Sequence, residues 1–161
     1  MKKVFTIILI GLLISSCSND DNNGIDCSLF DPAFPSLFIR IVDSNGANLI
    51  ENGTINPSNI TIDGDFPNAG FQFIPANEFA VADADIRAFD NSLNLSIPNE
   101  TSFQYTISTD GFETIKIDFE AELTRIPCDI TYFIPTRATF NGETLELMEI
   151  SSLEFLVIVE L

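Results

Sequence analysis

Residues 103–123, FQYTISTDGFETIKIDFEAEL, decide the fold of this chain. Two segments in which apolar and polar residues alternate flank Thr109-Asp110-Gly111, a combination typical of a tight turn. In the second segment the apolar face is predicted to be buried, namely Ile115, Ile117, Phe119, Ala121 and Leu123. The intervening residues are charged and are predicted to face water, namely Lys116, Asp118, Glu120 and Glu122. The stretch therefore predicts a β-hairpin with one buried face.

The rest of the chain is also patterned for strands. Short β-branched and aromatic runs are separated by Gly, Pro, Asn and Asp, without a helical period of useful length. Asn141-Gly142 within residues 139–145 predicts a second hairpin. About eight to ten short strands predict an all-β fold, an antiparallel β-sandwich of the Ig-like or transthyretin-like kind. The further predicted strands lie at residues 37–42, 48–55, 60–62, 71–74, 79–89, 93–97, 130–134 and 153–161.

Two apolar features indicate how this sandwich is filled. Residues 153–161, LEFLVIVEL, are nearly all apolar, so we expect this last strand inside a sheet and buried on both faces. The 15 phenylalanines are expected to supply most of the core, because a Phe ring buries a large area and has no polar atom.

Two motifs resemble those of known small sandwiches. Residues 39–50, IRIVDSNGANLI, and residues 107–119, ISTDGFETIKIDF, resemble the first and late strands of transthyretin-like and carboxypeptidase-regulatory-like domains. The resemblance covers residues 39–119 at most, and the chain departs from the pattern in the insert at residues 63–99 and in the strands after Cys128. It implies a β-sandwich and no enzyme activity.

The start of the chain has the features of a bacterial export signal. Lys2 and Lys3 precede the apolar run at residues 4–14, which as a helix would rise only about 16 Å. A hydrocarbon layer is about 30 Å thick, so the run predicts a secretory signal and no membrane span. Ile14-Ser15-Ser16-Cys17 resembles the bacterial lipobox, which implies diacylglycerol transfer to the Cys17 sulfur, removal of residues 1–16 and acylation of the new amino terminus. A plain secretory peptide with a chance cysteine is the alternative.

Residues 17–26 are predicted to be the lipidated cysteine and a flexible acidic tether, since small polar residues predominate there. Ser18 followed closely by Asp20 and Asp21 resembles the export tag of surface lipoproteins in Bacteroidota. The resemblance implies exposure on the outer face of the outer membrane, and a position facing the periplasm is the alternative.

The charge of the mature chain limits its partners. Removing residues 1–16 leaves five basic residues against 24 acidic ones, a formal net charge near −19. Such a chain repels nucleic acid phosphates, so nucleic acid is excluded as a partner. Solubility at a crowded surface and cation binding both remain as explanations of this acidity.

Cys27 and Cys128 remain once Cys17 is lipidated. In an oxidising compartment they are most simply one disulfide, and two separate buried thiols are the alternative. The mature chain of 145 residues is long enough for one domain, which we predict to span residues 27–161.

The sequence offers few candidates for a chemical site. It has no histidine, which excludes His-based triads, general bases and metal sites. Asp63-Gly64-Asp65 and Asp83-Ala84-Asp85 are the close acid pairs beyond the tether. Asp63 and Asp65 are the candidate Ca²⁺ ligands, although the further oxygen ligands of an EF-hand are missing and solvated or turn-forming acids are the alternative. No catalytic residue and no other cofactor are predicted.

These features together predict a lipid-anchored cell-envelope lipoprotein with a non-catalytic binding or structural β-sandwich. The alternatives are an accessory carbohydrate- or protein-capture module of a surface uptake system and a calcium-dependent adhesion module. The expected partners are the membrane, through the lipid anchor, and an envelope protein or glycan.

Overall fold

The computed structural model describes residues 24–81 and 84–161. The predicted signal peptide at residues 1–16, Cys17, most of the tether and Asp83 lie outside these ranges. The chain divides into two compact units. The described part of the smaller unit comprises residues 24–31 and 126–130, and the larger unit comprises residues 32–125 and 131–161.

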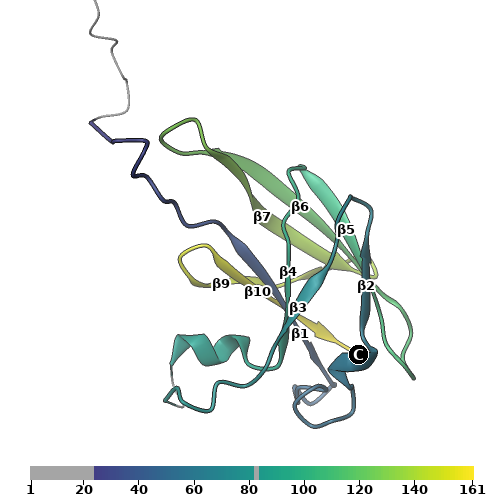
Figure 1. Cartoon of the computed structure of the whole chain (residues 1–161). Coiled ribbons are helices and arrows are strands. Elements are labelled where there is room, and N and C mark those ends of the chain that lie inside the picture. Colours follow the sequence, from purple (N-terminus) through teal and green to yellow (C-terminus); the bar gives the residue numbers. More distant parts are fainter. Residues whose placement is uncertain (1–23, 82–83) are drawn as a thin grey trace, which may run out of the picture. The chain divides into compact units, whose positions relative to one another are not determined.

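The larger unit is a sandwich of two five-stranded sheets, as the sequence predicts (Figure 1). Sheet A has the strand order β3-β4-β1-β10-β9, and sheet B has the order β2-β5-β6-β7-β8. The strands are β1 (Ser36–Val42), β2 (Thr61–Gly64), β3 (Phe71–Ile74), β4 (Ser92–Leu95), β5 (Ser102–Ser108), β6 (Ile115–Arg125), β7 (Thr131–Phe140), β8 (Glu143–Leu145), β9 (Leu147–Ser151) and β10 (Glu154–Glu160). Two short 3-10 helices, η1 (Pro57–Asn59) and η2 (Asp85–Phe89), lie in the connections.

The last strand lies inside sheet A, as its apolar composition predicts. β10 pairs with β9 on one side and with β1 on the other. Its pairing with β1 is parallel and runs from Ser36↔Glu154 to Val42↔Glu160. The sequence did not reveal this parallel pair, because two strands so far apart in the chain leave no local signal of their pairing. The prediction of burial on both faces holds for most of β10, although Ile158 is exposed.

The hairpin of β5 and β6 is confirmed, with Ile107 opposite Ile115 next to the turn. The predicted inner face of β6 is buried up to Ala121, whereas Leu123 is 56 % exposed. The pairing with β5 ends at Ser102↔Glu120, and the ladder to β7 shifts register between Glu120 and Ala121. Leu123 therefore lies past the end of the pairing between β5 and β6, and its predicted burial is wrong.

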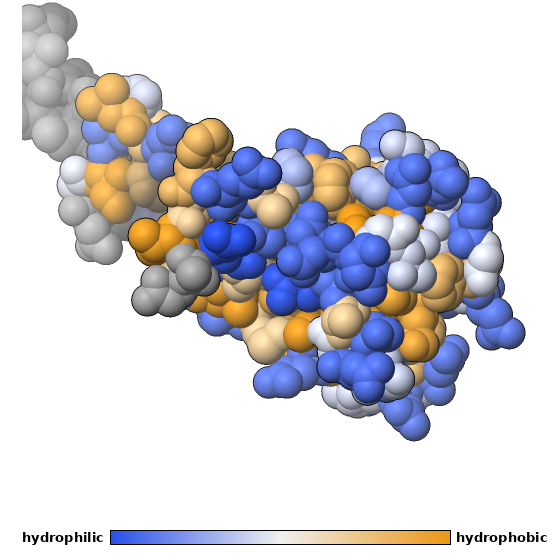
Figure 2. Space-filling view, turned by 90° about the horizontal axis from the view of Figure 1, so that it is seen from below, coloured by the Kyte–Doolittle hydropathy of each residue, from blue (hydrophilic) through white to orange (hydrophobic). Residues whose placement is uncertain are grey.

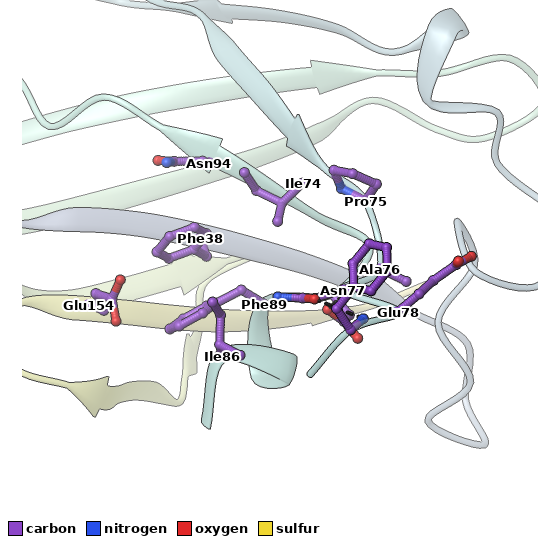
Figure 3. Close-up of a pocket in the computed structure, with 12 residues that line it drawn as sticks. Phe38, Ile74, Pro75, Ala76, Asn77, Glu78, Ile86, Phe89, Asn94 and Glu154 are labelled. Carbon is purple, nitrogen blue, oxygen red and sulfur yellow. Dashed lines mark hydrogen bonds between the residues drawn. The ribbon is translucent and has the colours of Figure 1, made fainter. Parts of the chain in front are cut away.

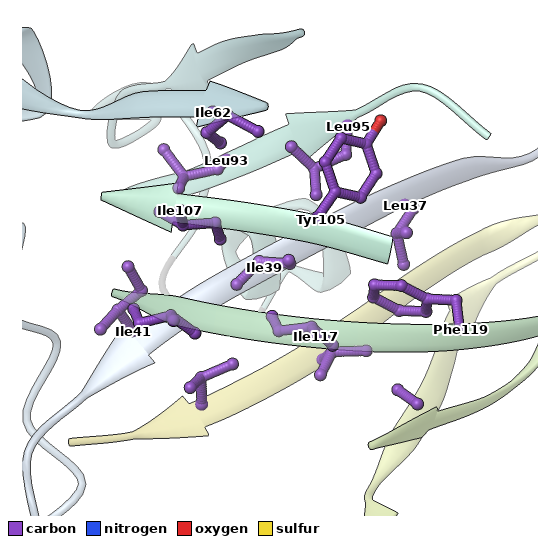
Figure 4. Packing of buried hydrophobic residues seen from close by; sticks show 14 of the residues in the cluster. Leu37, Ile39, Ile41, Ile62, Leu93, Leu95, Tyr105, Ile107, Ile117 and Phe119 are labelled. Carbon is purple, nitrogen blue, oxygen red and sulfur yellow. The ribbon is translucent and has the colours of Figure 1, made fainter. Parts of the chain in front are cut away.

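The main core lies between the two sheets (Figure 4). Contrary to the prediction, isoleucine and not phenylalanine is its most frequent residue: among the described residues it contains nine buried isoleucines and four buried phenylalanines. Four buried aromatic rings of this core gather in one place, where Phe103 stacks on Phe119 with centroids 5.0 Å apart and Phe66 meets Tyr105 edge to face. β-branched side chains suit the inward positions of strands, since their restricted rotamers lose little freedom there.

Tyr105 carries the polar group of this aromatic cluster. Its hydroxyl donates a hydrogen bond of 2.6 Å to the Ser96 carbonyl oxygen and lies 3.1 Å from the Ser96 Oγ. Burial raises the pKa of the Tyr105 phenol, because the charged form would lose its hydration. The phenol therefore stays neutral and ties β5 to the segment after β4.

Two predicted strands are absent from the described residues. Residues 48–55 form turns, because the Asn48 Oδ1 accepts hydrogen bonds from the amides of Ile50 and Glu51. Residues 79–89 end in η2 instead of forming a strand. In that segment Ala84 and Arg87 donate backbone hydrogen bonds within successive turns. In both segments, local hydrogen bonds from side chains or within turns take the place of the strand pairing that the sequence pattern predicted.

The smaller unit contains a disulfide between Cys27 and Cys128, which agrees with the pairing proposed from the sequence. The two residues are 101 positions apart in the chain. Cys128 and Asp129 both have positive φ, at 67° and 56°, and form the tip of the connection between β6 and β7. The covalent bond therefore joins this tip to the segment that precedes β1.

Removing the disulfide is expected to destabilise the protein. The Cys27→Ser/Cys128→Ser double variant should lose roughly 4 kcal/mol of unfolding free energy, because the chain-entropy estimate for a loop of about 100 residues is about 4.7 kcal/mol. Urea unfolding measures this difference. A reductant should lower the wild-type midpoint and leave the double variant unchanged. Equal midpoints for both proteins under oxidising conditions would contradict the crosslink.

Gly64 in β2 provides a packing test with a matched control. A Cβ at this position would lie 2.6 Å from the Ala69 Cβ and 2.8 Å from the Phe66 Cε1. Gly64→Ala should therefore cost about 1–3 kcal/mol of unfolding free energy through overpacking. Gly70→Ala should be nearly neutral, since nothing lies within 4 Å of the added atom. Indistinguishable urea midpoints for the two variants would show that β2 does not pack in this way.

Candidate functional site

The outer face of sheet A carries a second, smaller hydrophobic cluster. Along β1 the alternate residues Phe38 and Arg40 point away from the main core, because successive side chains of a strand point to opposite faces. Phe38 packs against Phe89 with ring centroids 4.2 Å apart and ring planes tilted by 31°, and both lie in one cluster with Leu156 of β10. The described part of the connection between β3 and β4, residues 75–81 and 84–91, thus packs on this face of the sheet through Phe89.

Asp90 holds the two ends of this connection together. Its Oδ1 accepts a hydrogen bond of 2.9 Å from the Asn77 amide, and its Oδ2 lies 3.0 Å from the Arg87 Nε. The Asn77 side chain in turn accepts from the amides of Phe79 and Ala80. These bonds join the two ends of the connection, whose described residues, 75–81 and 84–91, contain no strand.

Arg40 fastens η2 to the sheet beneath it. Its Nη2 donates to the carbonyl oxygens of Ala88 and Arg87, at the carboxyl end of η2. The Arg40 Nε is buried and has no hydrogen-bond partner among the residues that the structure describes. Asn48 adds a second tie, because its Nδ2 donates a hydrogen bond of 3.0 Å to the Asn91 carbonyl.

A groove of about 530 Å³ lies between this connection and the sheet (Figure 3). Phe38 lies between Ile74 on one side and Ile86 and Phe89 on the other. At its rim the Phe79 side chain is 100 % exposed and Ile86 is 54 % exposed. We call this feature the outer groove. Four other cavities among the described residues are smaller, at about 410, 390, 320 and 390 Å³.

The charged residues along the outer groove are all acidic. Glu78, Asp90 and Glu154 line it, and no Lys or Arg is among the described lining residues. Glu154 and Glu78 lie at opposite ends of the groove (Figure 3). The Glu154 Oε2 accepts a hydrogen bond from the Ser151 hydroxyl, whereas Glu78 makes no hydrogen bond or ion pair within the described chain. The site thus combines an aromatic floor with negatively charged ends.

A neighbouring cavity of about 410 Å³ is polar and includes Arg40, Asn48 and Arg87. Arg87 is paired with Asp90, and Asn48 bonds to backbone on both sides of its amide. These side chains are engaged in holding the connection, so this cavity is a weaker candidate for a ligand.

The structure does not assemble a metal site around the predicted Ca²⁺ ligands. Asp63 lies in β2, and Asp65 follows that strand with its Oδ1 accepting a hydrogen bond of 2.8 Å from the Gln104 amide. No group of three His, Cys, Asp or Glu side chains within residues 24–81 and 84–161 is placed to hold a metal ion. Of the second acid pair, Asp85 begins η2 and is exposed, while Asp83 is outside the described residues.

The outer groove was not predicted, because residues 79–89 were interpreted as a strand. Two signals in the sequence could have indicated it. Pro75 directly follows β3 and precedes Asn77, a pattern typical of a turn. Phe79, Val81 and Ile86 are apolar residues in the same irregular segment, and all three are exposed.

Comparisons with protein-family models, with curated proteins and with solved structures find no match to this chain. Within the described part, no helix is long and apolar enough to cross a membrane.

Arg40 is expected to control the order of η2. Arg40→Met should speed hydrogen exchange of the Arg87 and Asp90 amides about ten- to hundredfold, because a hydrogen bond to a charged group contributes about 1.5–3 kcal/mol. Hydrogen-exchange mass spectrometry of residues 84–91 measures the effect. Arg137→Met is the control, since Arg137 makes an exposed ion pair with Glu120 on sheet B. Unchanged exchange in Arg40→Met would mean that other contacts hold η2.

Proposed function

We propose that this protein is a lipid-anchored, non-catalytic binding module of the cell envelope that takes its ligand in the outer groove. The observation that carries the binding role is the groove itself, with exposed apolar side chains at its rim. Soluble domains rarely keep contiguous apolar surface exposed unless it serves an interaction. Pockets with an apolar floor and a few polar groups are the usual form of binding sites.

The anchor is supported by the sequence at the start of the chain. Lys2 and Lys3, the apolar run at residues 4–14 and the lipobox ending in Cys17 agree in order and spacing. Several acyl chains on one cysteine give stable attachment, because each buried CH₂ contributes about 0.8 kcal/mol. We place the protein in the outer membrane, with the sandwich exposed at the cell surface.

A non-catalytic role is supported by the absence of histidine from the sequence and by the kinds of residue along the groove. The described lining residues are apolar side chains, carboxylates and amides, without a hydroxyl, thiol or amine nucleophile. The capture of a protein by a surface uptake system remains compatible with this site. No observation on the described residues supports a glycan ligand or calcium-dependent adhesion.

Lipidation at Cys17 gives the test of the anchor. Cells fed an alkyne fatty acid should label the wild-type protein and the matched control Ser18→Ala, whereas Cys17→Ala should lose the label completely. Mass spectrometry of the mature wild-type protein should find a first peptide that begins at an acylated Cys17. A labelled Cys17→Ala variant, or an unmodified mature amino terminus, would disprove the anchor.

A further inference from the structure

We propose that the occupant of the outer groove is an extended protein segment in which Lys or Arg side chains stand next to apolar ones. This inference rests on the proposed function, because it names the ligand class of the same groove. Three properties of the described residues lead to it: the apolar surface, the sign of the charge and the free edge of a strand.

The apolar surface calls for a ligand with aliphatic or aromatic side chains. The packed rings of Phe38 and Phe89 form the floor together with Ile74. The Phe79 side chain is 100 % exposed to solvent, and Ile86 is 54 % exposed. Covering such side chains removes apolar area from solvent, which is favourable by about 25 cal/mol per Å².

The charge calls for a cation within the same ligand. Glu78 has no basic partner in the described chain, Glu154 bonds only to a hydroxyl, and no lining residue that the structure describes is basic. A Lys or Arg side chain can meet such carboxylates and lie against an aromatic face at the same time. The whole chain has a formal net charge of −17, so its field attracts cations before contact is made. Figure 2 shows one face of the molecule, on which hydrophilic and hydrophobic residues lie side by side.

The strand edge favours an extended backbone in the ligand. β3 is the edge strand of sheet A and pairs only with β4 among the described elements. β3 ends at Ile74, which is itself part of the groove. A segment that adds a strand to such an edge places alternate side chains on the outer face of the sheet. Its backbone bonds would give affinity, and its side chains in the groove would give selectivity.

A second copy of this chain is a poor occupant of the outer groove, because both copies are strongly acidic. Two copies would bring two acidic grooves and two net negative charges together, and these repel. The cationic segment is therefore the occupant that the described residues favour.

Three acetylated peptides of equal length test this proposal by charge alone. The first alternates Lys with Phe and Leu, the second has Gln in place of each Lys, and the third has Glu. Titration into the ¹⁵N-labelled protein from residue 24 to the end, oxidised at Cys27 and Cys128, gives both the Kd and the location of binding. Because that form lacks the first residues, the titration is repeated with the full mature protein in detergent.

The basic peptide is expected to bind at least about tenfold more tightly than the acidic one and to shift the amides of residues 74–79 and 86–90. Raising the salt concentration from about 0.1 M to about 0.5 M should weaken it several-fold, because exposed charges are then screened. Glu78→Gln should weaken the basic peptide about two- to fivefold and leave the Gln peptide unchanged. Phe79→Ser should weaken both about five- to tenfold. Glu143→Gln and Leu123→Ser are the matched controls, since both residues are exposed on sheet B, and should change nothing.

The other outcomes separate the two proposals. Shifts in the groove with equal affinity for all three peptides would overturn the cationic ligand and leave the groove as a binding site. Shifts confined to other surfaces, or no binding of any peptide, would overturn both the ligand class and the groove as its site. Concentration-dependent shifts of the groove amides without peptide would make a second copy the occupant, and would also overturn the inference.

Discussion

The parallel pairing of β1 with β10 is the constraint on which the rest of the sandwich depends. β1 is paired on both edges, with β4 and β10, and is covered on both faces. Its inner residues fill the main core, while Phe38 and Arg40 point outward. A shift by one residue would turn the Arg40 guanidinium into the apolar core, so burial of the inner face excludes that register. The first and last strands of the sandwich thus lie side by side in one sheet, and every other strand of sheet A is placed relative to them.

The same register explains why the outer face of sheet A carries the candidate site. With Phe38 and Leu156 outside, this face is too apolar to remain in water, and the connection between β3 and β4 covers part of it. The described residues of this connection are held by polar ties at Arg40 and Asp90 and leave part of the face uncovered. The outer groove is the part of that face left open. A packing requirement of the fold and a binding surface therefore have one origin.

The predictions from sequence succeeded where the structure is determined by neighbours along the chain. Alternation predicted the β5–β6 hairpin, and the Asn141-Gly142 pair, with φ of 51° and 81°, forms the turn that its residues favour. They failed where distant contacts decide. Residues 79–89 alternate like a strand but are bound to β1 through Arg40, and Leu123 lies past the end of a partner strand that the sequence does not specify. Several residues that line the outer groove belong to the segment 79–89. Because that segment was predicted as a strand, the sequence did not predict the groove.

The strong acidity of the chain and the exposed apolar rim of the groove are best understood together. A fully exposed phenylalanine promotes non-specific association, and a large net negative charge opposes it by repulsion between copies. That repulsion also discriminates among partners, because neutral or acidic segments of equal hydrophobicity gain no long-range attraction. Negative charge placed at the groove itself, through Glu78 and Glu154, applies the same discrimination at contact. Solubility alone would explain the acidity of the chain as a whole. At the outer groove, the same negative charge also selects for a cationic ligand.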